Sequence, residues 1–238
     1  MNPYKILIKF ASRSRPEKFF AGLDNILSKI DDKVNYVILV SADVDDASMY
    51  NKQVLTRLKH YVDNYNVIPV FGTSTSKIDA INRDMNVVTD WQILINFSDD
   101  MEFQVQGFDN IIREKFRAIF PDTNGNIFFN DGFVGDVLST MTIMGRMFYD
   151  AIGYIYHPSY FSLFCDEEYS NVCKKLNKIQ YYPDVLYKHN HPANGIGVPD
   201  AQLTRTEGYW GVDKKNFQER QLRNYDLKYD TITNVWFI

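Results

Sequence analysis

The sequence predicts an α/β fold in which a mostly parallel, doubly wound central sheet carries helices on both faces. Short apolar runs typical of buried strands alternate with amphipathic segments through the first hundred residues, and this order favours parallel strands joined by helical crossovers. The 238 residues are 45% hydrophobic, so the chain can bury a large core without disulfides or a structural metal. No linker or repeat divides it, and we expect one domain over residues 1–238.

The first half of the chain contains four expected strands and three expected helices. Residues 6–10 (ILIKF), 36–40 (YVILV), 67–71 (VIPVF) and 91–97 (WQILINF) are apolar runs of strand length. Between them, residues 16–30, 50–61 and 77–88 show the helical spacing of apolar side chains. In the first helix the apolar stripe consists of Phe19, Phe20, Leu23, Ile26, Leu27 and Ile30.

The second half of the chain is less regular. Residues 127–129, 140–144 and 180–187 are expected as short strands, and residues 147–153, 167–176 and 214–223 as helices. Gly and Pro recur from residue 192 to residue 211, so we expect a long loop there.

Charge and cysteine content exclude several classes of protein. A formal net charge of −4 excludes a nucleic-acid binder that relies on bulk positive charge, and the hydrophobic fraction excludes a disordered acidic chain. Cys165 and Cys173 would lie about 12 Å apart on one helix, beyond disulfide reach, which favours a reducing compartment such as the cytoplasm. No apolar run approaches the ~20 residues of a membrane helix, so we expect a soluble or at most peripheral protein.

Polar residues at the ends of the first two strands are candidates for ligand contacts, because open parallel sheets bind ligands at the carboxyl ends of their strands. Ser12, Arg13 and Arg15 follow the first strand, and two arginines beside hydroxyls at a helix start suit an anionic or heterocyclic ligand; a solvated turn before a helix is the alternative. Asp43 begins an acidic loop after the second strand and is suited to ribose hydroxyls, a base edge or a metal. The alternative is an acidic helix start.

Two further strand ends carry charged side chains. Lys77 begins the helix after the third strand, where it can meet a phosphate or simply be solvated. Asp99 and Asp100 directly follow the fourth strand. Two adjacent acids at the end of a buried strand are costly unless a cation balances them, and a hard divalent cation with diphosphate oxygens would do so.

Two later segments add a carboxylate and two imidazoles. Asp166 fits the N-cap of the helix expected at 167–176, with Glu167 in its first turn, and a carboxylate fixed at a helix end can also act as a base. His189 and His191 would point to the same side of an extended segment, so one of them is a candidate metal ligand. Exposed loop histidines are the alternative.

Taken in order, these motifs resemble a GT-A-fold glycosyltransferase of the family 2-like, phage or bacterial type, over about residues 5–192. Ser98-Asp99-Asp100 resembles the DxD motif with its first acid replaced by Ser. Residues 166–169 with 174–178 resemble the "ED…RL…G" block that carries the catalytic base, and residues 153–166 resemble phage and bacterial members. The resemblance implies the GT-A (nucleotide-diphospho-sugar transferase) fold. It divides the chain into a nucleotide-sugar half (1–101), an acceptor and catalytic half (102–191) and a C-terminal lid and helix (192–238).

The same resemblance implies an activity: metal-dependent transfer of a hexose from a nucleotide diphosphate sugar, foremost a UDP-sugar, to an acceptor hydroxyl with inversion. It implies that Asp43 contacts the base or ribose near Ser12 and Arg13. It also implies that Lys77 and Asn82 support the nucleotide and that Asp99 holds the ribose.

The metal and the catalytic base also follow from the resemblance. It implies that Asp100 and His191 bind Mn²⁺ or Mg²⁺, with His189 as the alternative ligand, and an imidazole beside carboxylates favours Mn²⁺. Asp166 is the implied base, with Glu167 as the alternative. The loop at 192–211 is a candidate lid.

Several alternatives stay open at this point. The chain could be a catalytically silent nucleotide- or carbohydrate-binding module, a sugar nucleotidyltransferase or a metal-dependent hydrolase, although residues 11–16 lack the nucleotidyltransferase glycines. Polysaccharide, glycolipid, protein and modified phage DNA remain possible acceptors. Aromatic residues are candidates for a sugar-stacking surface, namely Tyr154, Tyr156, Tyr160, Phe161 and Trp210. The late cations are expected mainly on a solvated helix face, with contact to the diphosphate or an acceptor as the alternative; they are Arg205, Lys214, Lys215, Arg220 and Arg223.

Overall fold

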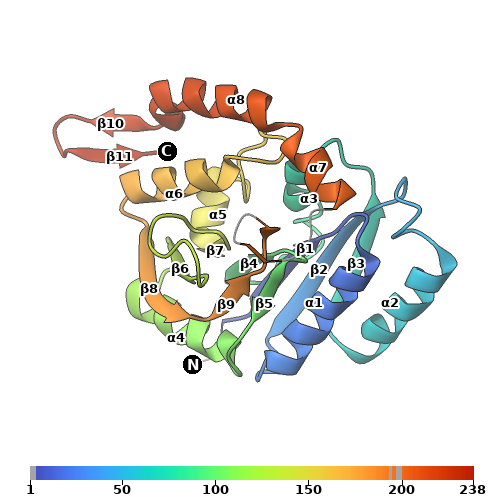
Figure 1. Cartoon of the computed structure of the whole chain (residues 1–238). Helices are drawn as coiled ribbons and strands as arrows, with labels where there is room; N and C mark the ends of the chain where they lie inside the picture. The colour runs from blue at the N-terminus through green and yellow to red at the C-terminus, as the bar shows by residue number, and fades with distance from the viewer. Residues whose placement is uncertain (1–3, 193–194, 197–199) are drawn as a thin grey trace.

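The computed structural model describes residues 4–192, 195–196 and 200–238, and its centre is a seven-stranded sheet of order β3-β2-β1-β4-β7-β6-β8 (Figure 1). Neighbouring strands are parallel except at β7, which runs antiparallel to both β4 and β6. The strands are β1 (Ile6–Ala11), β2 (Tyr36–Asp43), β3 (Val67–Gly72), β4 (Ile93–Phe97), β6 (Asn126–Asn130), β7 (Ile143–Gly145) and β8 (Ile179–Val185). The predicted mostly parallel sheet is confirmed.

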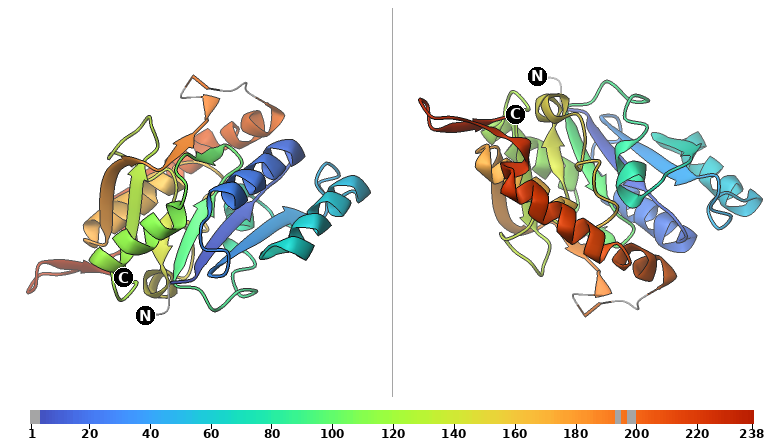
Figure 2. Two further views of the ribbon diagram at one scale, coloured as in Figure 1. Left: turned by 90° about the horizontal axis from the view of Figure 1, so that it is seen from below. Right: turned by 90° about the horizontal axis from the view of Figure 1, so that it is seen from above.

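Helices cover both faces of this sheet (Figure 2). One apolar cluster joins the sheet to α1, α2 and α4, and a second joins its other face to α3, α5, α6 and α8. The helices are α1 (Pro16–Lys29), α2 (Lys52–Asn64), α3 (Lys77–Asn82), α4 (Phe108–Ile119), α5 (Arg146–Ile152), α6 (Cys165–Lys175), α7 (Ala201–Glu207) and α8 (Trp210–Leu222). Alternation along β1 explains the two layers, because Ile6, Ile8 and Phe10 belong to the first cluster and Leu7 to the second.

A small antiparallel sheet brings the histidine segment to the end of β4. β5 (Met101–Phe103) pairs with β9 (Tyr187–His189), with Met101 opposite His189. The backbone N–H of Asn190 donates to the carbonyl of Asp100 at 2.7 Å. The strand expected at 180–187 was therefore wrong at its end: β8 stops at Val185, and the chain crosses to a different sheet.

Two other expected elements need correction, and one helix was not expected. The helix expected at 77–88 stops at Asn82, because Arg83 is extended and Asp84 is left-handed (φ 67°). The helix α4 was not predicted; it begins after Gly107 (φ 72°), where an added Cβ would lie 2.5 Å from Asp31 Oδ2. The loop expected at 192–211 contains α7 and the start of α8, and its residues 193–194 and 197–199 lie outside the described residues.

The C-terminal segment packs its helix on α6 and ends in a hairpin. After a short 3₁₀ turn (Asn224–Asp226), β10 (Lys228–Asp230) and β11 (Val235–Phe237) pair antiparallel and extend away from the body (Figure 1). Within the described ranges, no helix is long and apolar enough to cross a membrane. Cys165 and Cys173 both lie on α6 and form no disulfide, as their spacing predicted, and both are buried.

A buried ion pair fastens α8 to α6. Arg220 Nε lies 2.7 Å from Glu168 Oε2, with side chains 5% and 3% exposed, and the hydroxyl of Tyr160 donates to the same carboxylate at 2.7 Å. Arg220 also contacts Asp226 at 2.8 Å. Arg220 is therefore not on a solvated helix face as expected: it is a buried structural residue that orients the start of α6.

Loss of this ion pair is expected to destabilise the protein strongly. The substitution Arg220→Met keeps the apolar stem but leaves the Glu168 carboxylate buried without its cation, which lowers the free energy of unfolding by about 3–5 kcal/mol. Urea unfolding followed by circular dichroism measures the change. Asp150→Ala removes an exposed pair with Arg146 and serves as the control, with an expected cost below about 1 kcal/mol. Equal losses in the two variants would contradict the assignment.

Candidate active site

A cavity of about 370 Å³ opens at the carboxyl ends of β1, β2 and β4, where the sheet topology predicts a ligand site. Its walls also include residues from α3, α6, α7 and the segment after β9. Most of the site residues predicted from the sequence line it, namely Ser12, Arg13, Asp43, Lys77, Asp99, Asp100, Asp166, His189 and His191. Residues far apart in the chain thus meet in one place.

Asn82 and Glu167 are not part of the cavity lining. The Asn82 amide donates to the carbonyl of Tyr156 at 2.6 Å and accepts from the N–H groups of Ile155 (2.9 Å) and Tyr156 (3.2 Å), so it ties α3 to that segment. Glu167 is exposed on α6. Asp166 is not the N-cap expected from the sequence, because α6 begins at Cys165 after a left-handed Phe164 (φ 61°).

The two acids after β4 have different partners. Asp99 pairs with Arg15 at 2.9 Å, whereas Asp100 Oδ2 lies 3.4 Å from His189 Nε2. Burial raises the pKa of Asp99, with Arg15 acting against the increase and Asp100 adding to it. Burial acts in the same direction on Asp100, but hydrogen bonding to His189 and the charges of His189 and Lys77 bring its pKa below the usual range. Asp100 therefore stays ionised while Asp99 gains protons more easily.

Asp43, at the end of β2, is held in the cavity wall by several partners. Its side chain is 4% exposed, pairs with Arg13 Nη1 at 2.7 Å and accepts a hydrogen bond from the hydroxyl of Ser74 at 2.7 Å. Arg13 also holds Asp45 through two hydrogen bonds of 2.8 and 2.9 Å. Ser74 was not predicted, since a lone Ser in a polar loop carries no distinctive signal.

The helix α7 lies along the cavity and is held there by Arg15. Arg15 donates two hydrogen bonds to Asp200, of 2.7 and 2.8 Å, in addition to its contact with Asp99. Asp200 caps α7 by accepting from the N–H of Leu203 at 2.9 Å. Hydrogen bonding to Arg15 lowers the pKa of Asp200. Arg15 therefore connects the acid after β4 to the C-terminal segment, a role that the sequence did not show.

Buried polar atoms without partners are concentrated in this cavity. Among the residues that the structure describes, six buried side-chain nitrogen or oxygen atoms lack a hydrogen-bond partner, and five of them belong to lining residues. These five atoms are Ser12 Oγ, Arg13 Nε, Asn96 Oδ1, Asp100 Oδ1 and Ser162 Oγ. An unpaired buried polar group costs about 1–3 kcal/mol, so their concentration indicates a site built for a polar ligand.

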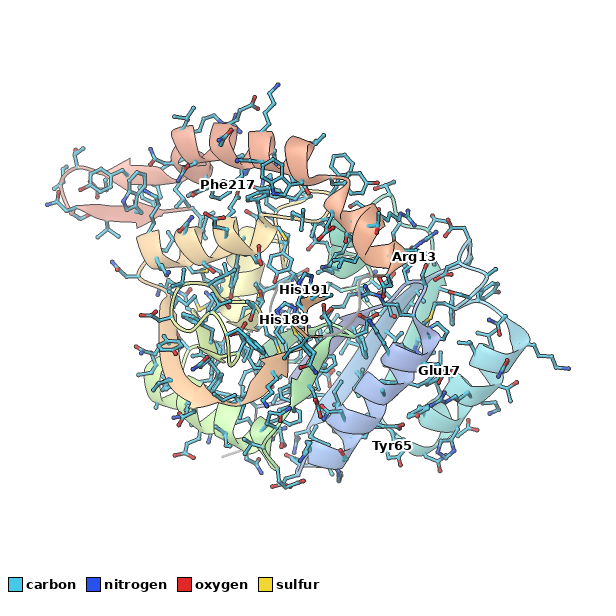
Figure 3. The ribbon with its side chains drawn as sticks, viewed as in Figure 1. Arg13, Glu17, Tyr65, His189, His191 and Phe217 are labelled. Atoms are coloured by element: carbon cyan, nitrogen blue, oxygen red, sulfur yellow. The ribbon has the colours of Figure 1, made fainter. Side chains whose placement is uncertain are left out.

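The residues around Asp100 fit a divalent cation that takes further ligands from a molecule bound in the cavity. Asp100 Oδ1 is buried without a partner, and the rings of His189 and His191 lie 5.5 Å apart beside it, in the middle of the molecule (Figure 3). Over the described part of the chain, no group of three or more His, Cys, Asp or Glu side chains could hold a metal alone. The donor set of carboxylate and imidazole suits Mn²⁺, provided that a ligand completes its coordination.

Comparison with known proteins gives matches in structure only. No protein-family profile and no characterised protein sequence matches the chain. The mannosyltransferase PcManGT from Pyrobaculum calidifontis, in complex with GDP-Man and Mn²⁺, has a TM-score of 0.61 at 11% identity, over 88% of this chain and 70% of that one. TarS 1–349 from S. aureus has a TM-score of 0.57 at 13% identity, over 77% of this chain and 59% of that one.

A further structure of TarS 1–349, in complex with UDP-GlcNAc, has a TM-score of 0.56 at 14% identity, over 88% of this chain and 66% of that one. The chain thus spans 59% to 70% of the length of these three structures. At such low identities the likeness establishes the fold: the chain has the GT-A fold that the sequence predicts.

Proposed function

We propose that the chain is a metal-dependent glycosyltransferase that transfers a hexose from a nucleotide diphosphate sugar to an acceptor hydroxyl. The observation that carries the proposal is the cavity at the strand ends, which combines unpaired buried polar atoms with Asp100 and Asp166. Support comes from structures of the same fold, which are described with GDP-Man and Mn²⁺, UDP or UDP-GlcNAc. We infer a UDP-sugar as the first donor to test.

The donor occupies the half of the cavity formed by residues 1–101. Asp43 contacts the base or ribose, close to the unpaired hydroxyl of Ser12 and to Arg13. Asp99 contacts the ribose. Lys77, which forms no ion pair within the described residues, supplies positive charge to the diphosphate.

Asp100 with His191 would hold Mn²⁺ or Mg²⁺, and His189, which directly contacts Asp100, is equally well placed. When bound there, the cation would supply Lewis-acid stabilisation of the charge on the departing diphosphate. The diphosphate of the donor would supply further oxygen ligands, so we expect the metal and the donor to bind together.

Asp166 acts as the base in the half formed by residues 102–191. It is the second residue of α6 and lines the cavity, and its Oδ1 accepts from the N–H of Glu167 at 3.0 Å. It takes the proton of the acceptor hydroxyl as that oxygen bonds to the anomeric carbon. The bond from this carbon to the diphosphate breaks, and its electrons leave with the nucleoside diphosphate. A single displacement inverts the anomeric centre.

A donor screen with the full chain tests this function. We expect one nucleotide sugar to raise the melting temperature only when Mn²⁺ or Mg²⁺ is present, and to release nucleoside diphosphate when an acceptor mixture is added. Stabilisation without release would identify a silent binding module. Pyrophosphate release from a nucleoside triphosphate and a sugar phosphate would identify a nucleotidyltransferase, and either result would contradict the proposal.

A further inference from the structure

Two aromatic rings stack at the rim of the cavity. The rings of Phe161 and Tyr209 lie parallel, with centroids 4.9 Å apart and an interplanar angle of 5°, and both residues line the cavity. Phe161 is 38% exposed, whereas Tyr156 and Tyr160 of the predicted stacking surface are buried in the core. Of the lining side chains considered for sugar stacking, Phe161 therefore has an accessible surface.

Asp213, in the first turn of α8, anchors the backbone of the two segments that carry these rings. Its fully buried carboxylate accepts from the backbone N–H groups of Phe161 (2.9 Å), Ser162 (2.8 Å) and Leu163 (2.8 Å). Its own N–H donates to the carbonyl of Tyr209 at 2.9 Å. Because one residue anchors both segments, a ligand that binds against the rings loses little free energy in ordering them.

Ser162, the residue after Phe161, adds an unpaired polar group to this part of the cavity lining. It is 4% exposed, it lines the cavity, and its hydroxyl has no hydrogen-bond partner. A buried hydroxyl that can both donate and accept is matched by a hydroxyl of a ligand. This observation is independent of the aromatic stack.

Asp166, four residues after Ser162, also lines the cavity. Arg205 on α7 lines the cavity too, four residues before Tyr209, and its charge contributes to the lowered pKa of Asp45, the carboxylate that Arg13 holds. The nearest cation along α3 is Lys77, whose neighbour Ile78 donates its N–H to the carbonyl of Phe161 at 3.3 Å. Lys77 is assigned to the diphosphate of the donor. An aromatic face, a hydroxyl and a carboxylate suit a neutral polyhydroxylated ring, and the Asp166 carboxylate would repel a phosphate placed beside it. Arg205 faces the Asp45 carboxylate, so we assign it to the donor side of the cavity, as we do Lys77.

We propose that Phe161, Tyr209 and Ser162 form the acceptor subsite and that the acceptor presents an uncharged sugar ring to it. The apolar face of the sugar lies against the Phe161–Tyr209 pair, one of its hydroxyls pairs with Ser162, and another is directed toward Asp166. This inference rests on the proposed glycosyl transfer and selects a neutral glycan from the acceptors that the sequence left open.

The test uses the full chain with the donor found in the screen. Methyl glycosides of glucose, galactose, mannose and N-acetylglucosamine are compared with glucose 6-phosphate and a single-stranded DNA oligonucleotide as accelerators of nucleoside diphosphate release. We expect at least one neutral glycoside to accelerate release and to be incorporated. Phe161→Ala raises the KM for that glycoside about tenfold, a change that corresponds to about 1.4 kcal/mol.

Further variants separate recognition from a general loss of structure. Phe161→Tyr keeps the ring and retains the wild-type KM, whereas Phe161→Leu keeps the volume without the ring and behaves as the alanine variant does. Ser162→Ala also raises the KM. Tyr229→Ala removes an aromatic side chain that is 44% exposed on the distant hairpin and leaves activity unchanged.

Two outcomes would overturn the subsite. One is acceleration only by glucose 6-phosphate or DNA; the other is a glycoside KM that does not respond to Phe161→Ala or Phe161→Leu. In both cases donor-dependent release persists, so the proposed function survives. A chain that neither binds nor cleaves any nucleotide sugar would instead overturn the proposed function, and this inference with it.

Discussion

Asp100→Ala is expected to abolish metal-dependent binding of the nucleotide while the protein stays folded. In the free protein the Asp100 side chain contacts His189 at 3.4 Å, and its Oδ1 is buried without a partner, so its removal also relieves a desolvated oxygen. In the complex, the substitution removes the carboxylate that would bind the metal beside the diphosphate. We expect the affinity for UDP with Mn²⁺ to fall by at least about 100-fold, measured by calorimetry.

The control for this experiment is Asp90→Ala. Asp90 is 71% exposed, pairs with Lys5 on the surface and does not line the cavity, so the affinity for UDP with Mn²⁺ is expected to match that of the original chain. A second comparison adds EDTA in place of Mn²⁺, which should bring the original chain down to the affinity of Asp100→Ala. An Asp100→Ala protein that binds UDP with unchanged affinity would remove Asp100 from the metal site.

The first half of the fold was predictable because its elements carry strong local patterns. The strand at 36–40 is an uninterrupted apolar run, the strand at 6–10 is interrupted only by Lys9, and the helix at 16–30 has a continuous apolar stripe. After residue 100 the strands β5, β7 and β9 have three residues each, too few for a periodicity to emerge. The positions of these strands depend on pairing with strands that are distant in the sequence, and a local sequence pattern does not show such pairing.

The helix α4 shows a different kind of failure. Its buried residues Phe108, Ile112 and Phe116 recur every four positions, a helical signal that the sequence contained but that was not used. The helix α7 lacked such a signal, because it has seven residues, follows a Gly- and Pro-rich stretch and is held by the Arg15–Asp200 pair. Its existence depends on a contact between residues 185 positions apart.

The candidate site was predictable where a residue directly follows a strand. Asp43 and Asp99 line one cavity because the carboxyl ends of parallel strands share an edge of the sheet. Asn96 offered a signal that was missed, namely an amide inside an otherwise apolar strand. Ser162 offered none, since its significance comes from a missing partner. Arg15 was noted only as one of two arginines suited to an anionic ligand, because its carboxylate partner Asp200 is distant in the sequence.

Asp166→Asn is expected to remove sugar transfer and leave donor binding intact. The amide keeps the shape of the side chain and its place at the second position of α6, but it cannot take the proton of the acceptor hydroxyl. We expect the rate at saturating donor and acceptor to fall by about 10²–10⁴-fold. Calorimetry with UDP and Mn²⁺ should show an unchanged dissociation constant, because the proposed donor contacts come from other elements.

Glu167→Gln is the matched comparison, since it makes the same change one residue further along the same helix, at an exposed side chain outside the cavity lining. If Asp166 is the base, the Glu167→Gln protein keeps most of the transfer rate while Asp166→Asn loses it. If transfer is instead lost only in the Glu167→Gln protein, the base is Glu167. In that case α6 would have to rotate when substrates bind, so that Glu167 enters the cavity. Retained transfer in both variants would exclude both carboxylates and move the base to another part of the cavity wall.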